Sequence, residues 1–143
     1  MPPAKRQRAT ELLTLSGGHA QPKRLIEYFR TGKLTDVVLE ASDGTPFSAH
    51  RNILAASSDY LDGRMGADWR DSSGPVKLPT MSPAVLERLL DYVYVGETSL
   101  PESLLIPLLE AAHYLAVGPL LDAASKAIEV RLDSSNGELR RRP

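Results

Sequence analysis

Cysteine is absent from this sequence of 143 residues. Its absence excludes a disulfide framework and any thiolate metal site, and it removes cysteine redox catalysis from the candidate functions. Long apolar runs are missing too, because charge or proline interrupts each one before the roughly 20 residues that a membrane span requires. The N-terminus also lacks the apolar core of a secretory signal. We therefore expect a protein of the cytoplasm or the nucleus that has no membrane partner.

Neither sign of charge is in excess. The sequence has 17 Lys and Arg residues and 18 Asp and Glu residues, for a formal net charge of −1. Because these charges are mixed along the body of the chain, we expect no general attraction to phosphate backbones and no direct nucleic-acid partner. Short basic runs stand at the two ends, at residues 5–8 and 140–142. Such runs can act as nuclear-import signals, although they are more often solvated tails.

Motifs that carry chemistry are absent as well. The sequence has no Gly-rich phosphate loop, no nucleophile elbow and no His-Glu-x-x-His zinc helix. Its three histidines lie far apart, and His113 is expected to be a structural residue. Asp36 and His50 could be imagined as an acid and base pair, but both stand at element boundaries, where such residues usually cap. We therefore expect neither an enzyme nor a cofactor or metal site.

Two terminal segments flank a predicted folded body at residues 22–132. Residues 1–21 are rich in Pro, Gly, Ser and charge, with a hinge at Gly17 and Gly18, so this segment is predicted to be flexible. Residues 133–143 are predicted to be a flexible tail. One short apolar element interrupts the first segment, either as a brief strand or as a helical turn. Nothing local covers its three leucines, so we expect them to pack only when a partner is present; they are Leu12, Leu13 and Leu15.

The body begins with a predicted amphipathic helix at residues 22–31, which Gly32 ends. The hydrophobic period then changes from that of a helix to that of a strand. A hairpin is predicted at residues 37–49, where Asp43 and Gly44 supply two residues that tolerate positive φ. The sheet should therefore start directly after the first helix.

From His50 the pattern is helical again, and a second short helical turn follows. Residues 66–75 then form a predicted loop around Trp69, the one tryptophan of the chain. Aromatic residues on loops often anchor interfaces. A third strand is predicted at residues 76–78.

The remainder of the body is predicted to be helical. One helix has Ser82 as its N-cap and Gly96 at its end. Another starts with a capping box at residues 99–102 and stops at Gly118 and Pro119, before a last helix. The fold class is therefore α+β, with a small, mainly three-stranded sheet and five or six helices.

One run, at residues 36–61, reads DVVLEASDGTPFSAHRNILAASSDYL. It closely resembles the opening of BTB/POZ domains of the Kelch-like type, in which an Asp-Val-x-Leu strand and a turn precede Phe-x-Ala-His-Arg/Lys. The resemblance continues at residues 76–78, 90–96 and 108–115, and it covers about residues 22–132. It implies the BTB/POZ fold, in which a small sheet is flanked by helical hairpins.

The resemblance implies a homodimer in which the first helix packs against its twin across a two-fold axis. An N-terminal strand is often exchanged between subunits in similar domains, which would explain the uncovered leucines. Asp36 and Arg51 are implied to form a largely buried charged pair near this interface, the alternative being two ordinary surface charges. The implied interface residues are Leu12, Leu13, Leu15, Leu25, Ile26, Phe29, Asp36 and Arg51.

A second implied surface docks the third cullin, the scaffold of a RING-type ubiquitin ligase. Family members that bind it carry a hydrophobic-x-Glu motif, which Trp69 and Asp71 match with a shorter acid. Four positions depart from the usual family residues, namely Leu61, Gly63, Arg64 and Met65. The alternative is that Trp69 packs onto its own domain. The implied docking residues are Tyr60, Leu61, Arg64, Met65, Trp69, Asp71 and Tyr114.

Two functions of different classes follow from the resemblance. The first is a non-enzymatic adaptor of a cullin–RING ubiquitin ligase that brings substrate near the ligase. The alternative is a transcription or chromatin factor whose BTB dimer recruits a corepressor through a groove at the subunit interface. The domains that follow the BTB/POZ domain would separate the two functions, because Kelch, MATH or BACK segments indicate the ligase and zinc fingers indicate transcription.

Overall fold

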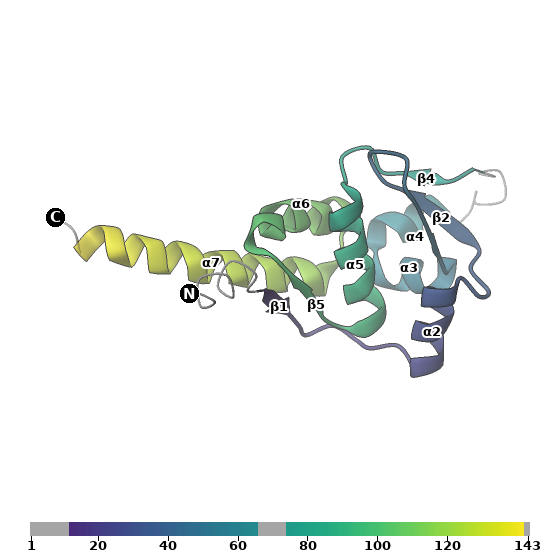
Figure 1. Cartoon of the computed structure of the whole chain (residues 1–143), viewed down its shortest axis with the longest axis horizontal. Coiled ribbons are helices and arrows are strands. Elements are labelled where there is room, and N and C mark those ends of the chain that lie inside the picture. The colour runs from purple at the N-terminus through teal and green to yellow at the C-terminus, as the bar shows by residue number, and fades with distance from the viewer. Residues whose placement is uncertain (1–11, 66–73, 142–143) are drawn as a thin grey trace, which may run out of the picture.

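Two small sheets and a set of helices form the fold in the computed structural model, which describes residues 12–65 and 74–141 (Figure 1). The three-stranded sheet has the strand order β3-β2-β4, and the second sheet pairs β1 with β5. The predicted α+β class is confirmed. The elements in chain order are β1 (Leu13–Leu15), α2 (Lys23–Thr31), β2 (Val37–Glu40), β3 (Pro46–Ala49), α3 (Arg51–Ser57), α4 (Asp59–Met65), β4 (Val76–Lys77), α5 (Pro83–Val95), β5 (Thr98–Leu100), η2 (Glu102–Leu104), α6 (Leu105–Leu115) and α7 (Gly118–Arg141).

The predicted hairpin is present as β2 and β3, which pair antiparallel, and β4 adds to β2 in parallel. In the turn between β2 and β3, Gly44 adopts a positive φ, of 90°, and Asp43 does not. Asp43 stabilises the turn in another way. Its Oδ1 accepts hydrogen bonds from the Thr45 hydroxyl at 2.7 Å and from the Thr45 backbone N–H at 3.0 Å. These bonds lower the pKa of Asp43.

Both predicted ends of α5 are confirmed. The Ser82 hydroxyl accepts a hydrogen bond from the Val85 backbone N–H at 3.2 Å, which satisfies one of the free amides of the first turn. Gly96 ends the helix in the left-handed conformation, with a φ of 89°. The apolar stripe between these ends is buried, with Leu86 and Leu89 at its centre. This helix is therefore the central element of the core.

The helix after α5 begins later than predicted. Ser99, expected to cap it, lies in β5, and the short segment η2 precedes α6. The α6 helix ends at Ala116, which has a φ of 54°, and Gly118, expected to stop it, instead begins α7. Because α7 continues to Arg141, the tail expected at residues 133–143 is helical up to that residue.

The sequence predicted that the first apolar element packs only when a partner is present, but in the single chain a strand far away in the sequence covers it. β1 pairs antiparallel with β5 of the same chain, with Thr14 opposite Ser99, and the two strands lie side by side in Figure 1. Leu15 is only 4% exposed and belongs to the main core, whereas Leu12 is 53% exposed. One chain therefore supplies both strands of the second sheet. Sequence periodicity missed β5 because its partner strand lies far away along the chain.

Tyr94 joins α2, α5 and the end of β3. Its ring is fully buried and stacks on Phe29 of α2, with ring centroids 4.0 Å apart. Its hydroxyl accepts a hydrogen bond from the His50 backbone N–H at 2.9 Å and lies 2.7 Å from His50 Nδ1. His50 Nε2 lies 2.9 Å from the Lys33 carbonyl oxygen, which can only accept. In the neutral imidazole Nε2 therefore carries the proton, and the Tyr94 hydroxyl donates to Nδ1.

Tyr94→Phe should lower the free energy of unfolding by about 1–3 kcal/mol, because it leaves buried His50 atoms without a hydrogen-bond partner. The substitution should also change the response to alkali. Burial raises the pKa of Tyr94 to about 12. This folded-state pKa lies above the unfolded value of about 10. The contribution of the neutral Tyr94 hydroxyl to the free energy of unfolding is therefore complete below about pH 10 and is lost as the pH rises toward 12.

Chemical denaturation at a series of pH values between about 9 and 12 measures both effects. The wild-type chain should lose stability in that window, and Tyr94→Phe should lack this part of the loss. Tyr28→Phe, at a half-buried tyrosine of α2, is the control. Equal effects of the two substitutions would contradict the role assigned to Tyr94.

Candidate protein-interaction site

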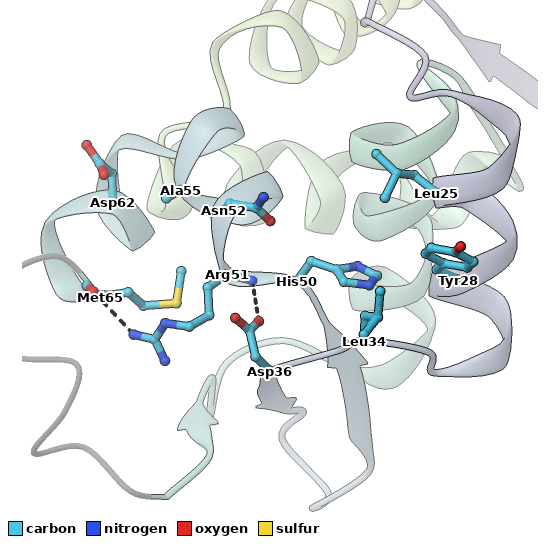
Figure 2. A pocket seen from close by; sticks show the side chains of 10 residues that line it. All are labelled: Leu25, Tyr28, Leu34, Asp36, His50, Arg51, Asn52, Ala55, Asp62 and Met65. Atoms are coloured by element: carbon cyan, nitrogen blue, oxygen red, sulfur yellow. Dashed lines mark hydrogen bonds between the residues drawn. The ribbon is translucent and has the colours of Figure 1, made fainter.

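A groove of about 570 Å³ opens on the surface beside α2 and α3 (Figure 2). No residue of α2 is fully buried, so the apolar side chains of this helix are only partly covered by the chain itself. An apolar centre with charged groups beside it is typical of a protein–protein interface. We call this surface the groove face; its lining residues are Leu25, Tyr28, Leu34, Asp36, His50, Arg51, Asn52, Ala55, Asp62 and Met65.

Asp36 and Arg51 meet at the start of α3. Asp36 Oδ1 accepts a hydrogen bond of 2.7 Å from the Arg51 backbone N–H, drawn as a dashed line in Figure 2. A carboxylate at this place satisfies a free amide of the helix and interacts favourably with its dipole. The Arg51 side chain reaches the other way, and its Nη2 donates to the Met65 carbonyl oxygen at 3.2 Å. This pair therefore ties the end of α4 to α3 and to the chain that enters β2.

The sequence predicted a largely buried Asp36–Arg51 pair. In the structure of the single chain the pair is less buried than predicted. Asp36 is exposed and Arg51 is half-buried. The short contact of the carboxylate is made with the backbone of Arg51, where the resemblance implied a pairing of side chains. Burial of the two residues by a second copy stays a prediction.

The predicted interface residues fall into two places. Leu25 lines the groove, while Phe29 turns inward onto Tyr94. The leucines of the N-terminal segment lie elsewhere, since β1 packs beside β5 and α7, away from α2 (Figure 1). Of the residues predicted for the dimer, the groove face therefore gathers Leu25, Asp36 and Arg51.

A second cluster lies on α4 and α6. The rings of Tyr60 and Tyr114 are 5.0 Å apart between centroids, and their hydroxyls are 3.3 Å apart. Arg64 Nη1 donates to the Tyr60 hydroxyl at 3.1 Å. The hydrogen bond between the tyrosines, followed by that from Arg64, lowers the pKa of Tyr60. The same hydrogen bond between the tyrosines raises the pKa of Tyr114. We call these three residues the tyrosine face.

Buried Ser58 positions α4 against α6 and so brings the tyrosine face together. Its hydroxyl donates to the Leu115 carbonyl oxygen and accepts a hydrogen bond from the Leu61 backbone N–H. The same packing corrects the predicted docking set. Leu61 and Met65 are 1% and 5% exposed and belong to the core, so they cannot contact a cullin directly. Trp69 and Asp71 lie outside the described residues.

The residues that the structure describes include no group of three or more His, Asp or Glu side chains that could hold a metal ion. None of the described helices is both long and apolar enough to cross a membrane. His113, expected to be structural, is exposed on α6.

Comparison with known proteins decides the family. A family model for the BTB/POZ domain matches residues 25–132. This chain belongs to the BTB/POZ family. The BTB/POZ domain is a protein-interaction module.

Kelch-like proteins are among the relatives of this BTB/POZ domain. It is 34% identical over 103 residues to Kelch-like protein 38 of Danio rerio, and the matched segment covers 71% of this chain and 18% of that protein. It is 35% identical over 105 residues to human Kelch-like protein 21, with 73% and 18% covered. Identity to human Kelch-like protein 34 is 39% over 106 residues, with 73% and 16% covered. The chain thus spans less than a fifth of the length of these relatives.

A solved structure agrees on the fold. The BTB domain of zebrafish PATZ1 superposes on this BTB/POZ domain with a TM-score of 0.64 and 21% sequence identity, covering 79% of this chain and 98% of that one.

Sequence reasoning missed one residue of the groove face. Leu34 is 72% exposed and has a φ of 60°, a left-handed conformation that costs a branched or bulky residue about 1–2 kcal/mol. The residue stands two positions after the Gly32 that ends α2, where its apolar character attracted no notice in a polar stretch. A large apolar side chain that is exposed on a strained backbone is a candidate contact for a partner.

Proposed function

We propose that this BTB/POZ domain forms a homodimer through the groove face and acts as a substrate adaptor of a cullin–RING ubiquitin ligase. The tyrosine face is the docking surface for the third cullin. In this role the domain holds substrate near the ligase, in the cytoplasm or the nucleus, and performs no chemistry itself. The observation that carries the proposal is the presence of two separate, incompletely covered surfaces on a domain whose family mediates protein contacts.

The groove face supports the homodimer. The apolar side chain of Leu34 is exposed, and the backbone of this residue is strained. The apolar residues of α2 beside it are only half-buried. In a two-fold dimer the same patch serves both subunits, so one such surface suffices. The exposed carboxylate of Asp36 at the edge of the groove would then be covered by the second copy.

The tyrosine face supports cullin docking. Tyr114 is 46% exposed, and its ring packs against the ring of Tyr60. The pair therefore presents an aromatic surface in which each ring supports the other. Tyrosine is among the residues that most often dominate binding energy at interfaces. The resemblance to Kelch-like domains implies that the same positions face the cullin. The loop with Trp69 follows α4 directly in the sequence.

The homodimer predicts that Leu34→Asp raises the dissociation constant of the dimer at least about tenfold, equivalent to about 1.4 kcal/mol. The reason is that a carboxylate would have to be desolvated where a leucine now offers apolar area. Sedimentation equilibrium measures this constant. Leu132→Asp is the control, because Leu132 is also exposed, at 56%, but lies on α7. A wild-type chain that stays monomeric at high micromolar concentration would exclude the homodimer.

Calorimetric titration with the N-terminal region of the third cullin tests the adaptor role. We expect binding, with Trp69→Ala and Tyr114→Ala each costing about 1–2 kcal/mol, because aromatic residues at interface centres are common hot spots. Val130→Ala, at a residue of α7 that is 64% exposed, should leave the affinity unchanged. Arg64→Met should tighten the complex, since the arginine charge must be desolvated or displaced on docking.

The titration also separates the two functional classes. If no heat appears at high micromolar concentration, the adaptor role is excluded, and a dimer that recruits a corepressor takes its place. If binding occurs but Tyr114→Ala has no effect, docking does not use the tyrosine face.

A further inference from the structure

Three helices meet at Ser58. This residue directly follows α3, and its backbone N–H donates to the Leu54 carbonyl oxygen at 2.9 Å. It also caps the start of α4, where its hydroxyl accepts the Leu61 backbone N–H at 3.0 Å and its carbonyl oxygen accepts the Asp62 backbone N–H at 2.9 Å. The hydroxyl proton is donated to the Leu115 carbonyl oxygen at the end of α6. One residue therefore ties the end of α3, the start of α4 and the end of α6 together.

The end of α6 supplies the acceptors for this junction. The last carbonyl groups of a helix have no partner within the helix and must find one elsewhere. Ala116 ends α6 with a φ of 54°, and its backbone N–H turns back to carbonyl groups of the last turn. The Leu115 carbonyl oxygen accepts the Ser58 hydroxyl, and the Ala116 carbonyl oxygen accepts the Asp59 backbone N–H at 3.3 Å. The start of α4 therefore caps the end of α6.

The tyrosine face lies directly beside this junction. Tyr60 stands two residues after Ser58, and Tyr114 immediately precedes Leu115. Packing of apolar side chains between α4 and α6 is not directional, whereas a hydrogen bond tolerates only a narrow range of distances and angles. The Ser58 hydroxyl therefore fixes how far α4 is shifted along α6, and with it the position of one ring against the other. Ser58 is only 3% exposed, so it cannot touch a partner itself.

We propose that Ser58 is a positioning residue for docking on the tyrosine face: its hydroxyl holds Tyr60 against Tyr114, and the affinity for the docked partner depends on that arrangement. The identity of this partner, the third cullin, rests on the proposed function, whereas the position of the two rings belongs to the single chain. A surface that already has its bound arrangement loses less conformational entropy when a partner binds. Without the Ser58 hydroxyl the partner would have to order the two rings itself.

Nuclear Overhauser effects between the rings of Tyr60 and Tyr114 test the positioning in the full chain without any partner. The wild-type chain should show these cross-peaks, because the ring centroids are 5.0 Å apart. Ser58→Ala should remove or strongly weaken them. Ser58→Thr should restore them, since it keeps the hydroxyl and the backbone of this residue is extended, which suits a β-branched side chain. The matched control is Ser82→Ala, the same change at the N-cap of α5, which should leave the cross-peaks intact.

Calorimetric titration of the same variants with the N-terminal region of the third cullin tests the effect on docking. Ser58→Ala should raise the dissociation constant about fivefold, because the rings lose their fixed arrangement. Ser82→Ala, which also removes a helix cap, should change it by less than about twofold. Ser58→Ala should have little further effect in a chain that already carries Tyr114→Ala, because Ser58 acts through that ring.

Unchanged ring cross-peaks in Ser58→Ala would overturn the inference, and so would equal weakening of the complex by Ser82→Ala or a fully additive loss in the double variant. A wild-type chain that binds no cullin would overturn the proposed function and the effect on docking, while the cross-peaks alone would still decide whether Ser58 positions the rings. If Ser58→Ala does not fold, Ser58→Cys replaces it with the same expected results, because the thiol is similar in size but only a weak donor and acceptor.

Discussion

The contacts of Tyr94 are the constraint on which the arrangement of this domain depends. A single buried side chain holds α2 by ring stacking, and it holds the start of α3 through two contacts with His50. The backbone of the same residue holds the N-terminal segment through Gln21. Without a tyrosine at this position the two walls of the groove would lack a common support. The hydroxyl has a structural task, because His50 and Lys33 complete its network.

The two proposed interaction surfaces consist of side chains that the core leaves exposed. The fold buries one stripe of α4 and α6 and turns Tyr60, Arg64 and Tyr114 outward. On another surface, α2 lies over α5 with its apolar residues half-covered and Leu34 held in a strained turn. Charge plays a supporting part, since Asp36 and Arg51 fasten the groove through backbone atoms. The proposed dimer and the proposed cullin complex therefore use different surfaces and do not compete for the same residues.

The sequence predicted best those elements whose signals are local. Ser82 and Gly96 mark the ends of α5 because a cap and a left-handed stop act within one turn of the helix. β5 was missed because its pairing with β1 is long-range, and Ser99 in it looks like a cap when only its neighbours are considered. The docking set was partly wrong for a similar reason. The burial of Leu61 and Met65 depends on α6, which periodicity alone does not place.

The central claim is that a second copy of the chain covers the groove face. Hydrogen–deuterium exchange, measured by mass spectrometry at concentrations above and below the dimer dissociation constant, tests this claim most directly. The account predicts that amides near Leu25, Leu34 and Asp36 are more protected at the higher concentration than at the lower one. Equal protection of these amides at the two concentrations would contradict it.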